Sequence, residues 1–238
     1  MKTVEEGSFW DHLEELRHRL FRVASVVAGS VILAFVFCRH LMAAVISRAP
    51  QTLQTLAPTE AFAAHLNISL AAGLLVSSPV IFFQFWRFVA PGLYRKERRK
   101  AVLAAAVSVL LFLAGAAFAW FVMLNPAIRV FESFEEGGIQ GQWSLANYIA
   151  FLSRFILIFA VAFQLPVLVM LLVKLGVVTP DFLAKYRRHI VVGLLVAAAI
   201  LTPPDPLTQV MLTLPLYLLF ELSLLAARMG YRKRKASG

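Results

Sequence analysis

Two carboxylates outside the apolar segments are the first residues of this sequence that could do chemistry. Glu97 is the single acid in GLYRKERRK, residues 92–100, where five cations surround it. Glu15 lies in the leader GSFWDHLEELRHRLF, and on an amphipathic helix it falls on the polar face, four residues before Arg19. Each carboxylate can bind a cation, yet a solvated spacer or a local ion pair has the same pattern. From periodicity and charge alone, the solvated interpretation is favoured for both.

A second group of polar side chains lies inside the apolar segments, where charge is otherwise nearly absent. Gln164 stands in VAFQLPV, two residues before Pro166, and the proline leaves a backbone carbonyl without its helical donor in the same turn. This pattern predicts a polar patch at membrane depth, although an interhelical hydrogen bond that only holds helices together explains it equally well. The last apolar segment carries Gln209 and Glu221, and Asp205 precedes it where an aspartate can cap a helix N-terminus.

Motifs of known catalytic or metal chemistry are missing from the sequence. It contains no Gly-x-Ser-x-Gly, no His-Glu-x-x-His and no glycine-rich phosphate loop. Its five histidines are scattered over different segments, and a lone cysteine, Cys38, excludes a multi-cysteine metal site. The cations lie in short segments between apolar runs, which argues against a nucleic-acid surface. We therefore expect no catalytic residues, no metal, no cofactor and no nucleic-acid partner, and the protein is not expected to be an enzyme.

Membrane helices must position these polar residues, because 60% of the residues are hydrophobic, 15% are charged and the mean hydropathy is +0.77. A bilayer core of about 30 Å needs about 20 helical residues. The prolines of TPPDP cannot continue a helix and divide the last apolar region into two short spans. The sequence thus predicts an all-α integral membrane protein with six transmembrane helices, at about 20–42, 62–86, 101–126, 147–173, 189–203 and 206–226.

The segments outside the spans complete this expected organisation. The leader is predicted to form an N-terminal amphipathic helix that lies on the membrane surface. Residues 1–227 are expected to form a single membrane domain, and the basic tail 228–238 is expected to be disordered. The lone Cys38 is interpreted as a packing residue.

The distribution of lysine and arginine predicts the orientation in the membrane. With both termini inside, the inner side carries four in the leader, six in the second loop, four in the fourth loop and five in the tail. The outer side keeps only Arg39, Arg48, Arg129 and Arg154. Positive charge accumulates on the cytoplasmic side of membrane proteins. We therefore expect a multi-pass protein of the cytoplasmic (inner) membrane with both termini in the cytoplasm.

Five ordered stretches resemble TatC, the multispanning subunit of the twin-arginine protein translocase. They are HLEELRHRL in the leader, PTEAF before the second span, SPVIFFQFWRFVAPGLYRKERR through the first cytoplasmic loop, VAFQLPV in the fourth span and LTPPDPLTQVMLTLPLYLLFEL in the last hairpin. The resemblance covers roughly residues 9–227. It implies a receptor for signal peptides that carry paired arginines and route folded proteins across the cytoplasmic membrane.

The resemblance also implies which residues do this. In the family, a leader glutamate and a loop glutamate recognise the two arginines, and these positions are Glu15 and Glu97. Arg17 and Phe88 fall on family positions linked to the same surface. The chemistry fits, because a carboxylate can accept two parallel bonds from the planar guanidinium fork, so two carboxylates at a fixed separation select arginine over lysine.

Partners follow from the same resemblance. Single-span proteins of the TatA and TatB type are expected near Gln164 and near the last hairpin, and the working complex is expected to be oligomeric. Many relatives carry glutamate where this chain has Gln164, so the resemblance supports hydrogen bonding there and no charge pairing.

Two other classes of membrane protein compete with this interpretation. A secondary transporter with a polar midplane site also has proline-broken helices, but it predicts related halves and several ionisable groups at the midplane. An intramembrane enzyme needs a nucleophile with a base, or a metal set, at membrane depth. The sequence shows none of these features.

Overall fold

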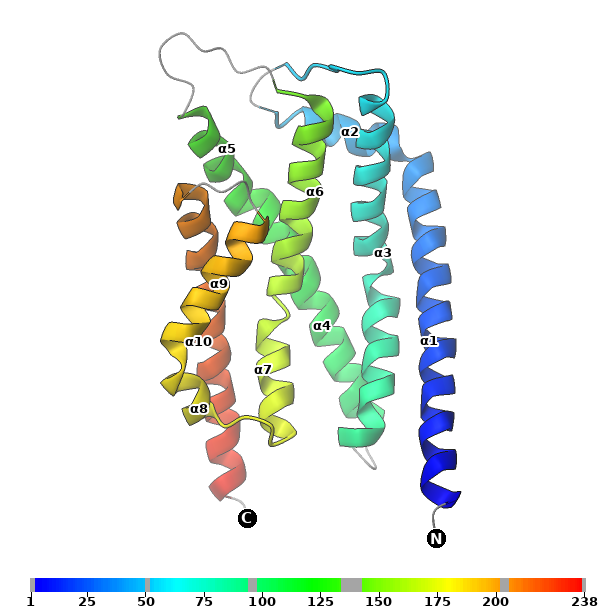
Figure 1. Ribbon diagram of the computed structural model, residues 1–238, viewed down its shortest axis with the longest axis vertical. Helices are drawn as coiled ribbons and strands as arrows, with labels where there is room; N and C mark the ends of the chain where they lie inside the picture. Colours follow the sequence, from blue (N-terminus) through cyan, green and yellow to red (C-terminus); the bar gives the residue numbers. More distant parts are fainter. Residues whose placement is uncertain (1–2, 50–51, 94–97, 134–142, 202–205, 237–238) are drawn as a thin grey trace. The chain divides into compact units, whose positions relative to one another are not determined.

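The computed structural model describes residues 3–49, 52–93, 98–133, 143–201 and 206–236, which are mostly helical (Figure 1). Within these ranges, five helical stretches are long and apolar enough to cross a membrane. They are Leu13–Val36, Glu60–Val89, Ala101–Glu132, Leu145–Lys174 and Leu212–Met229. The all-helical, multispanning class predicted from the sequence is therefore confirmed. The fifth predicted span corresponds to a helix of 15 residues, Arg187–Leu201, about 22 Å long, so the count of six stays a prediction.

The chain divides into two compact units. Unit 1 consists of Met1–Ser47 and His65–Val109, and unit 2 consists of Arg48–Ala64 and Leu110–Gly238. Unit 1 contains α1 (Thr3–Val36), α2 (Cys38–Ile46), most of α3 (Glu60–Leu93) and the first half of α4 (Arg98–Phe118). Unit 2 contains the remainder of α4, a π-helical turn η1 (Ala119–Met123), α5 (Leu124–Glu132), α6 (Leu145–Ala162), α7 (Leu165–Lys174), α8 (Pro180–Lys185), α9 (Arg187–Leu201) and α10 (Pro206–Ala236).

The leader and the first span form one continuous helix, α1, of 34 residues. The sequence predicts an amphipathic helix on the membrane surface and a span at about 20–42, and in the structure no break separates these two segments. No proline interrupts the junction, and ion pairs one turn apart support the helix across it, from Arg17 to Glu14 and from Arg19 to Glu15. The helix ends at Val36, and α2 begins after Phe37.

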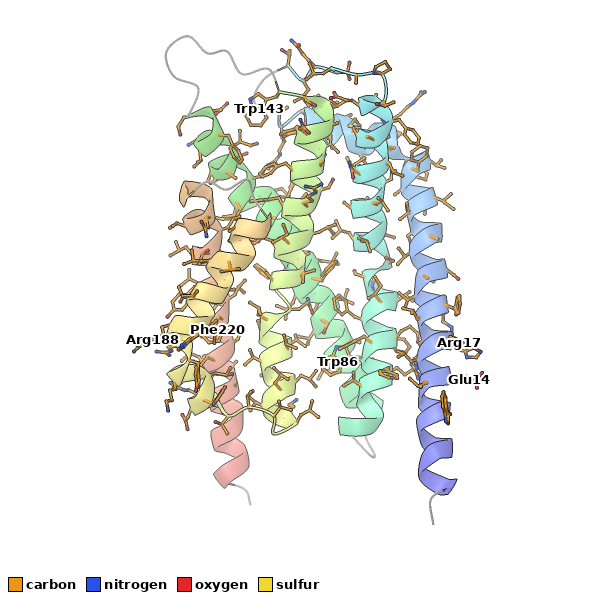
Figure 2. The ribbon with its side chains drawn as sticks, in the orientation of Figure 1. Glu14, Arg17, Trp86, Trp143, Arg188 and Phe220 are labelled. Carbon is orange, nitrogen blue, oxygen red and sulfur yellow. The ribbon has the colours of Figure 1, made fainter. Side chains whose placement is uncertain are left out.

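Within unit 1, close contacts fix α3 against its neighbours. A Cβ atom built on Gly73 would lie 2.8 Å from both the backbone nitrogen and the Cα of Val31, so only glycine permits this approach of α1 and α3. Trp86 points from α3 towards α4, and its indole Nε1 donates to the Ser108 hydroxyl at 2.8 Å (Figure 2). Both ends of this bond are buried. The position of α3, and of the polar side chains near its C-terminal end, is thus set by packing on both sides.

Unit 2 is built around an aromatic core. Phe155 and Phe159 of α6 pack with Leu212 and Leu216 of α10, and all four side chains are buried. Gly115 of α4 lies against α6 so closely that a Cβ there would be 2.5 Å from the carbonyl oxygen of Phe159. Helix α10 runs alongside α7 and α9 (Figure 1). These contacts determine which polar side chains of α9 and α10 can meet.

Three boundaries in unit 2 differ from the predictions. The third span, predicted over 101–126, runs through the π-helical turn η1 to Glu132, and the fourth, predicted over 147–173, is interrupted between Ala162 and Leu165. Helix α10 continues to Ala236, so the tail expected to be disordered is helical up to that residue. Its arginines, lysines and alanine are good helix formers, so a charged composition alone does not indicate disorder.

Candidate functional site

Glu15 is an accessible carboxylate on α1 that is bound by an arginine of its own helix. Arg19 donates to Glu15 Oε1 from Nε at 3.0 Å and also from Nη2. The Glu15 side chain is 41% exposed, whereas the Arg19 side chain is only 14% exposed. The i,i+4 pair predicted from the sequence is therefore confirmed, and it is asymmetric: the acid is exposed and its basic partner is largely enclosed.

A buried amide on α3 holds the other side of Arg19. Arg19 Nη1 lies 3.4 Å from Gln84 Oε1, and the exposed fraction of Gln84 is 6%. Arg19 thus bridges a charged acceptor on α1 and a neutral acceptor on α3. Gln84 stands among aromatic residues in FFQFW, and its contact with Arg19 was not predicted from the sequence. A buried polar residue in an apolar run was the available signal, as it was for Gln164.

The other predicted residues of this surface differ in their surroundings. Arg17 pairs with Glu14 at 3.0 Å, both side chains are 62% exposed, and both project from α1 on the side away from α3 (Figure 2). Phe88 is half-buried on the same helix as Gln84. Glu97 lies outside the described residues. Glu15, Arg17 and Phe88 all belong to unit 1.

This arrangement is suited to binding a guanidinium. The Glu15 carboxylate already accepts two N–H donors of one arginine, and an accessible carboxylate held in place loses little rotamer freedom when a second ligand arrives. Among the described residues, no group of three or more histidine, cysteine, aspartate or glutamate side chains could hold a metal ion.

Gln164 occupies the break between α6 and α7. Its backbone N–H donates to Val161 O at 2.9 Å, and its carbonyl accepts from Leu168 N at 2.9 Å. Pro166 stands in the first turn of α7, where the missing N–H is tolerated. The sequence predicts a polar patch here within one continuous span, whereas the structure has two helices joined at Phe163 and Gln164.

The polar residues of the last span are engaged with α9. Arg187 Nη2 donates to Glu221 Oε2 at 2.9 Å, and the Tyr217 hydroxyl donates to Glu221 Oε1 at 2.9 Å. Nearer the segment that joins the two helices, Gln209 Nε2 donates to the carbonyl of Leu195 at 2.9 Å. Both Glu221 and Gln209 thus hold α10 to α9, and Asp205 lies outside the described residues.

We expect replacement of Glu221 by glutamine to destabilise unit 2 by about 1–2 kcal/mol, because the pair is only partly buried. The exposed fractions are 42% for Arg187 and 23% for Glu221, and Arg187 Nε is buried with no partner among the described residues. A lower thermal midpoint of the detergent-solubilised protein would measure this effect. Arg188→Gln is the matched control, since Arg188 is exposed and points away from unit 2 (Figure 2). Equal midpoints for Glu221→Gln and the control would contradict the prediction.

A further acid organises the loop that precedes α3. Glu60, from the PTEAF stretch, accepts from the Leu56 N–H at 2.9 Å and from the Ser144 hydroxyl at 3.1 Å. Ser144 caps α6, and backbone bonds join Gln54 to the residues on either side of it. The sequence predicted that a helix begins near here, but it did not predict that Glu60 ties this loop to α6.

Known proteins resemble the chain in both sequence and structure. The family model described as Sec-independent protein translocase protein (TatC) matches residues 11–215. The chain is 34% identical to TatC of Desulforapulum autotrophicum over 98% of this chain and 88% of that protein. It is 38% identical to TatC of Aquifex aeolicus over 94% of this chain and 96% of that protein.

Two crystal structures of the twin-arginine translocase receptor TatC have the same fold. One, determined in DDM, superposes with a TM-score of 0.83 at 35% identity and covers 91% of this chain and 99% of that one. The other has a TM-score of 0.82 at 37% identity and covers 92% of this chain and 98% of that one. A family match over most of the sequence, relatives this similar along most of their length, and a shared fold show that the chain belongs to the TatC family of Sec-independent protein translocase proteins.

Proposed function

We propose that this protein is the receptor component of a twin-arginine translocase and that it binds paired-arginine signal peptides through Glu15 and Glu97. Membership of the TatC family makes it a translocase subunit for Sec-independent protein export rather than an enzyme. The observation that carries the binding site is the Glu15 carboxylate, which is accessible and is held in place by two N–H donors of one guanidinium, both bound to Oε1. The secondary transporter that competed on sequence grounds has no comparable support.

The remaining parts of the site are assigned by the same resemblance. Arg17 and Phe88 lie in unit 1 with Glu15, and we place them on the peptide-binding surface. Glu97 supplies the second carboxylate, and its five neighbouring cations favour its ionised form. Each guanidinium can donate a forked pair of charge-assisted bonds to one carboxylate. A site with two carboxylates therefore binds a peptide with two adjacent arginines more tightly.

The membrane arrangement that serves this function has six spans with both termini in the cytoplasm. The supporting observation is the charge asymmetry of the loops, with nineteen lysines and arginines on the inner side and four on the outer. Helix α9 provides the short fifth span, and neighbouring lipid accommodates a short helix by local thinning. In this orientation Glu15 and Glu97 face the compartment in which the signal peptides are made.

We assign the contacts with TatA- and TatB-type single-span partners to unit 2. Gln164 lies at the break of the fourth span, where backbone and side-chain polar groups meet inside the membrane. Asp205, Gln209 and Glu221 belong to the last hairpin, and an oligomeric working complex follows if several copies assemble through these helices. Co-purification from the native membrane, with Gln164→Leu as the variant, tests this assignment through loss of the single-span partners.

Peptide binding by the detergent-solubilised protein tests the receptor function directly. A fluorescent signal peptide with two adjacent arginines is expected to bind at least about tenfold more tightly than the same peptide with two lysines, because lysine cannot form the forked pairs. Fluorescence anisotropy measures both dissociation constants. A protein that binds the two peptides equally, or neither of them, would not be this receptor.

A further inference from the structure

Two arginines of α1, two positions apart, are held in opposite ways. Arg17 makes one bond to Glu14, and both side chains are 62% exposed. Arg19 makes two bonds to Glu15 and reaches Gln84 on α3, and its side chain is 14% exposed. Arg17 can leave its partner at little cost, since exposed pairs contribute little. Arg19 cannot, because moving away would break the bonds of its own largely enclosed guanidinium and remove this donor from the buried Gln84 amide.

This permanent neighbour changes what Glu15 offers to a ligand. The guanidinium of Arg19 offsets the negative charge of the carboxylate and repels any second cation that approaches. A lysine ammonium binds a carboxylate as a point charge, so the repulsion removes much of its attraction. An arginine also gains from the geometry of its forked hydrogen bonds, which depend on a carboxylate held in one orientation.

We propose that Arg19 is a specificity-determining residue of the receptor: it lowers the affinity of Glu15 for cations in general and thereby favours paired arginines over paired lysines. This inference rests on the proposed function, in which Glu15 contacts the peptide. Arg19 itself acts through Glu15 and does not touch the peptide. Arg19 thus weakens binding at Glu15 but increases the difference in affinity between paired arginines and paired lysines.

A purely structural role for Arg19 makes a different prediction. If Arg19 only ties α1 to α3, its loss weakens binding of both peptides by the same factor, and the ratio of their dissociation constants stays the same. If Arg19 sets specificity, the ratio changes. The ratio for paired-lysine against paired-arginine peptides is therefore the quantity to measure, on the full chain in detergent.

The test uses Arg19→Gln, Arg19→Lys and Arg22→Gln. We expect Arg19→Gln to bind the paired-lysine peptide about tenfold more tightly and to lower the ratio by a similar factor. Arg19→Lys keeps a cation beside Glu15 and should hold the ratio within about threefold of the unsubstituted protein. Arg22→Gln removes one exposed charge from the same helix and should leave the ratio unchanged. An unchanged ratio in Arg19→Gln, or a ratio in Arg19→Lys that falls as far, overturns the proposal.

Two further variants keep the test decisive. If Arg19→Gln does not fold, Gln84→Leu replaces it. This substitution keeps the ion pair between Arg19 and Glu15 but releases Arg19 from α3. We expect the ratio of the two dissociation constants to fall about threefold. An unchanged ratio in that variant also overturns the proposal. Glu15→Gln separates the two hypotheses. If Glu15→Gln retains full affinity for the paired-arginine peptide, the proposed binding site is wrong. If Glu15→Gln loses affinity but Arg19→Gln leaves the ratio of dissociation constants unchanged, only the specificity role of Arg19 is contradicted.

Discussion

Replacing Glu15 or Glu97 by glutamine is expected to weaken binding of a paired-arginine signal peptide by about tenfold to a hundredfold, and replacing both is expected to abolish it. A hydrogen bond to a charged group contributes about 1.5–3 kcal/mol, and each 1.4 kcal/mol is a factor of about ten. Because the Glu15 side chain is 41% exposed, its single replacement belongs at the lower end of this range. Fluorescence anisotropy with the labelled peptide measures the affinity, and export of a twin-arginine precursor in cells measures the consequence.

Asp181→Asn is the control for this prediction. Asp181 lies in α8 of unit 2, is exposed and carries the same charge, so its replacement removes one negative charge without touching the proposed contacts. Membrane insertion should be normal in all of these variants, because none of them removes a lysine or arginine that sets topology. Full affinity in the double variant would rule out recognition by these two carboxylates.

The second large effect is expected from Gly115→Ala, which should lower the thermal midpoint of the protein or prevent folding. A Cβ at this position would lie 2.5 Å from the Phe159 carbonyl oxygen and 2.9 Å from the Ala160 Cα. Both are backbone atoms in unit 2, so relief requires α4 and α6 to move apart. Overpacking of this kind costs about 1–3 kcal/mol, and here it also disturbs the buried Phe159. Thermal unfolding in detergent, followed by size-exclusion chromatography, measures the loss.

Gly193→Ala provides the comparison for Gly115. A Cβ on Gly193 in α9 would meet no atom within 4 Å, and alanine is the better helix former by about 1 kcal/mol. The control should therefore be as stable as the unsubstituted protein or slightly more stable. Equal midpoints for Gly115→Ala and Gly193→Ala would mean that the close approach of α4 and α6 is not required for the fold.

Pairing within a helix was easier to predict than pairing between helices. Glu15 and Arg19 were expected to meet because residues four apart lie on one face of a helix. The contact of Arg19 with Gln84 spans 65 positions, and that of Arg187 with Glu221 spans 34. Such contacts depend on how each helix is rotated and where two helices cross, and no local pattern carries that information.

Breaks and irregular turns in helices also divide into those with a local sequence signal and those without one. Pro166 predicts a carbonyl without its helical donor, because its ring removes a backbone N–H, and in the structure the fourth span is interrupted just before it. The π-helical turn at Ala119–Met123 lies in a run of apolar residues and had no such signal. There, the Trp120 carbonyl accepts from Arg48 Nη1 at 3.3 Å, and the Arg48 guanidinium stands 4.9 Å from the Trp120 ring.

The sequence by itself determined the all-helical membrane class and the family, and it predicted the spans and the orientation. Hydropathy and charge act residue by residue, because each apolar side chain gains separately from burial in lipid and each cation is separately costly to transfer. The tertiary structure alone decided that Glu15 is backed by an enclosed arginine bound to α3, and that Glu221 is held by α9. These arrangements arise from close contacts such as Gly73 with Val31, where steric exclusion fixes the separation of two helices and hence which side chains can meet.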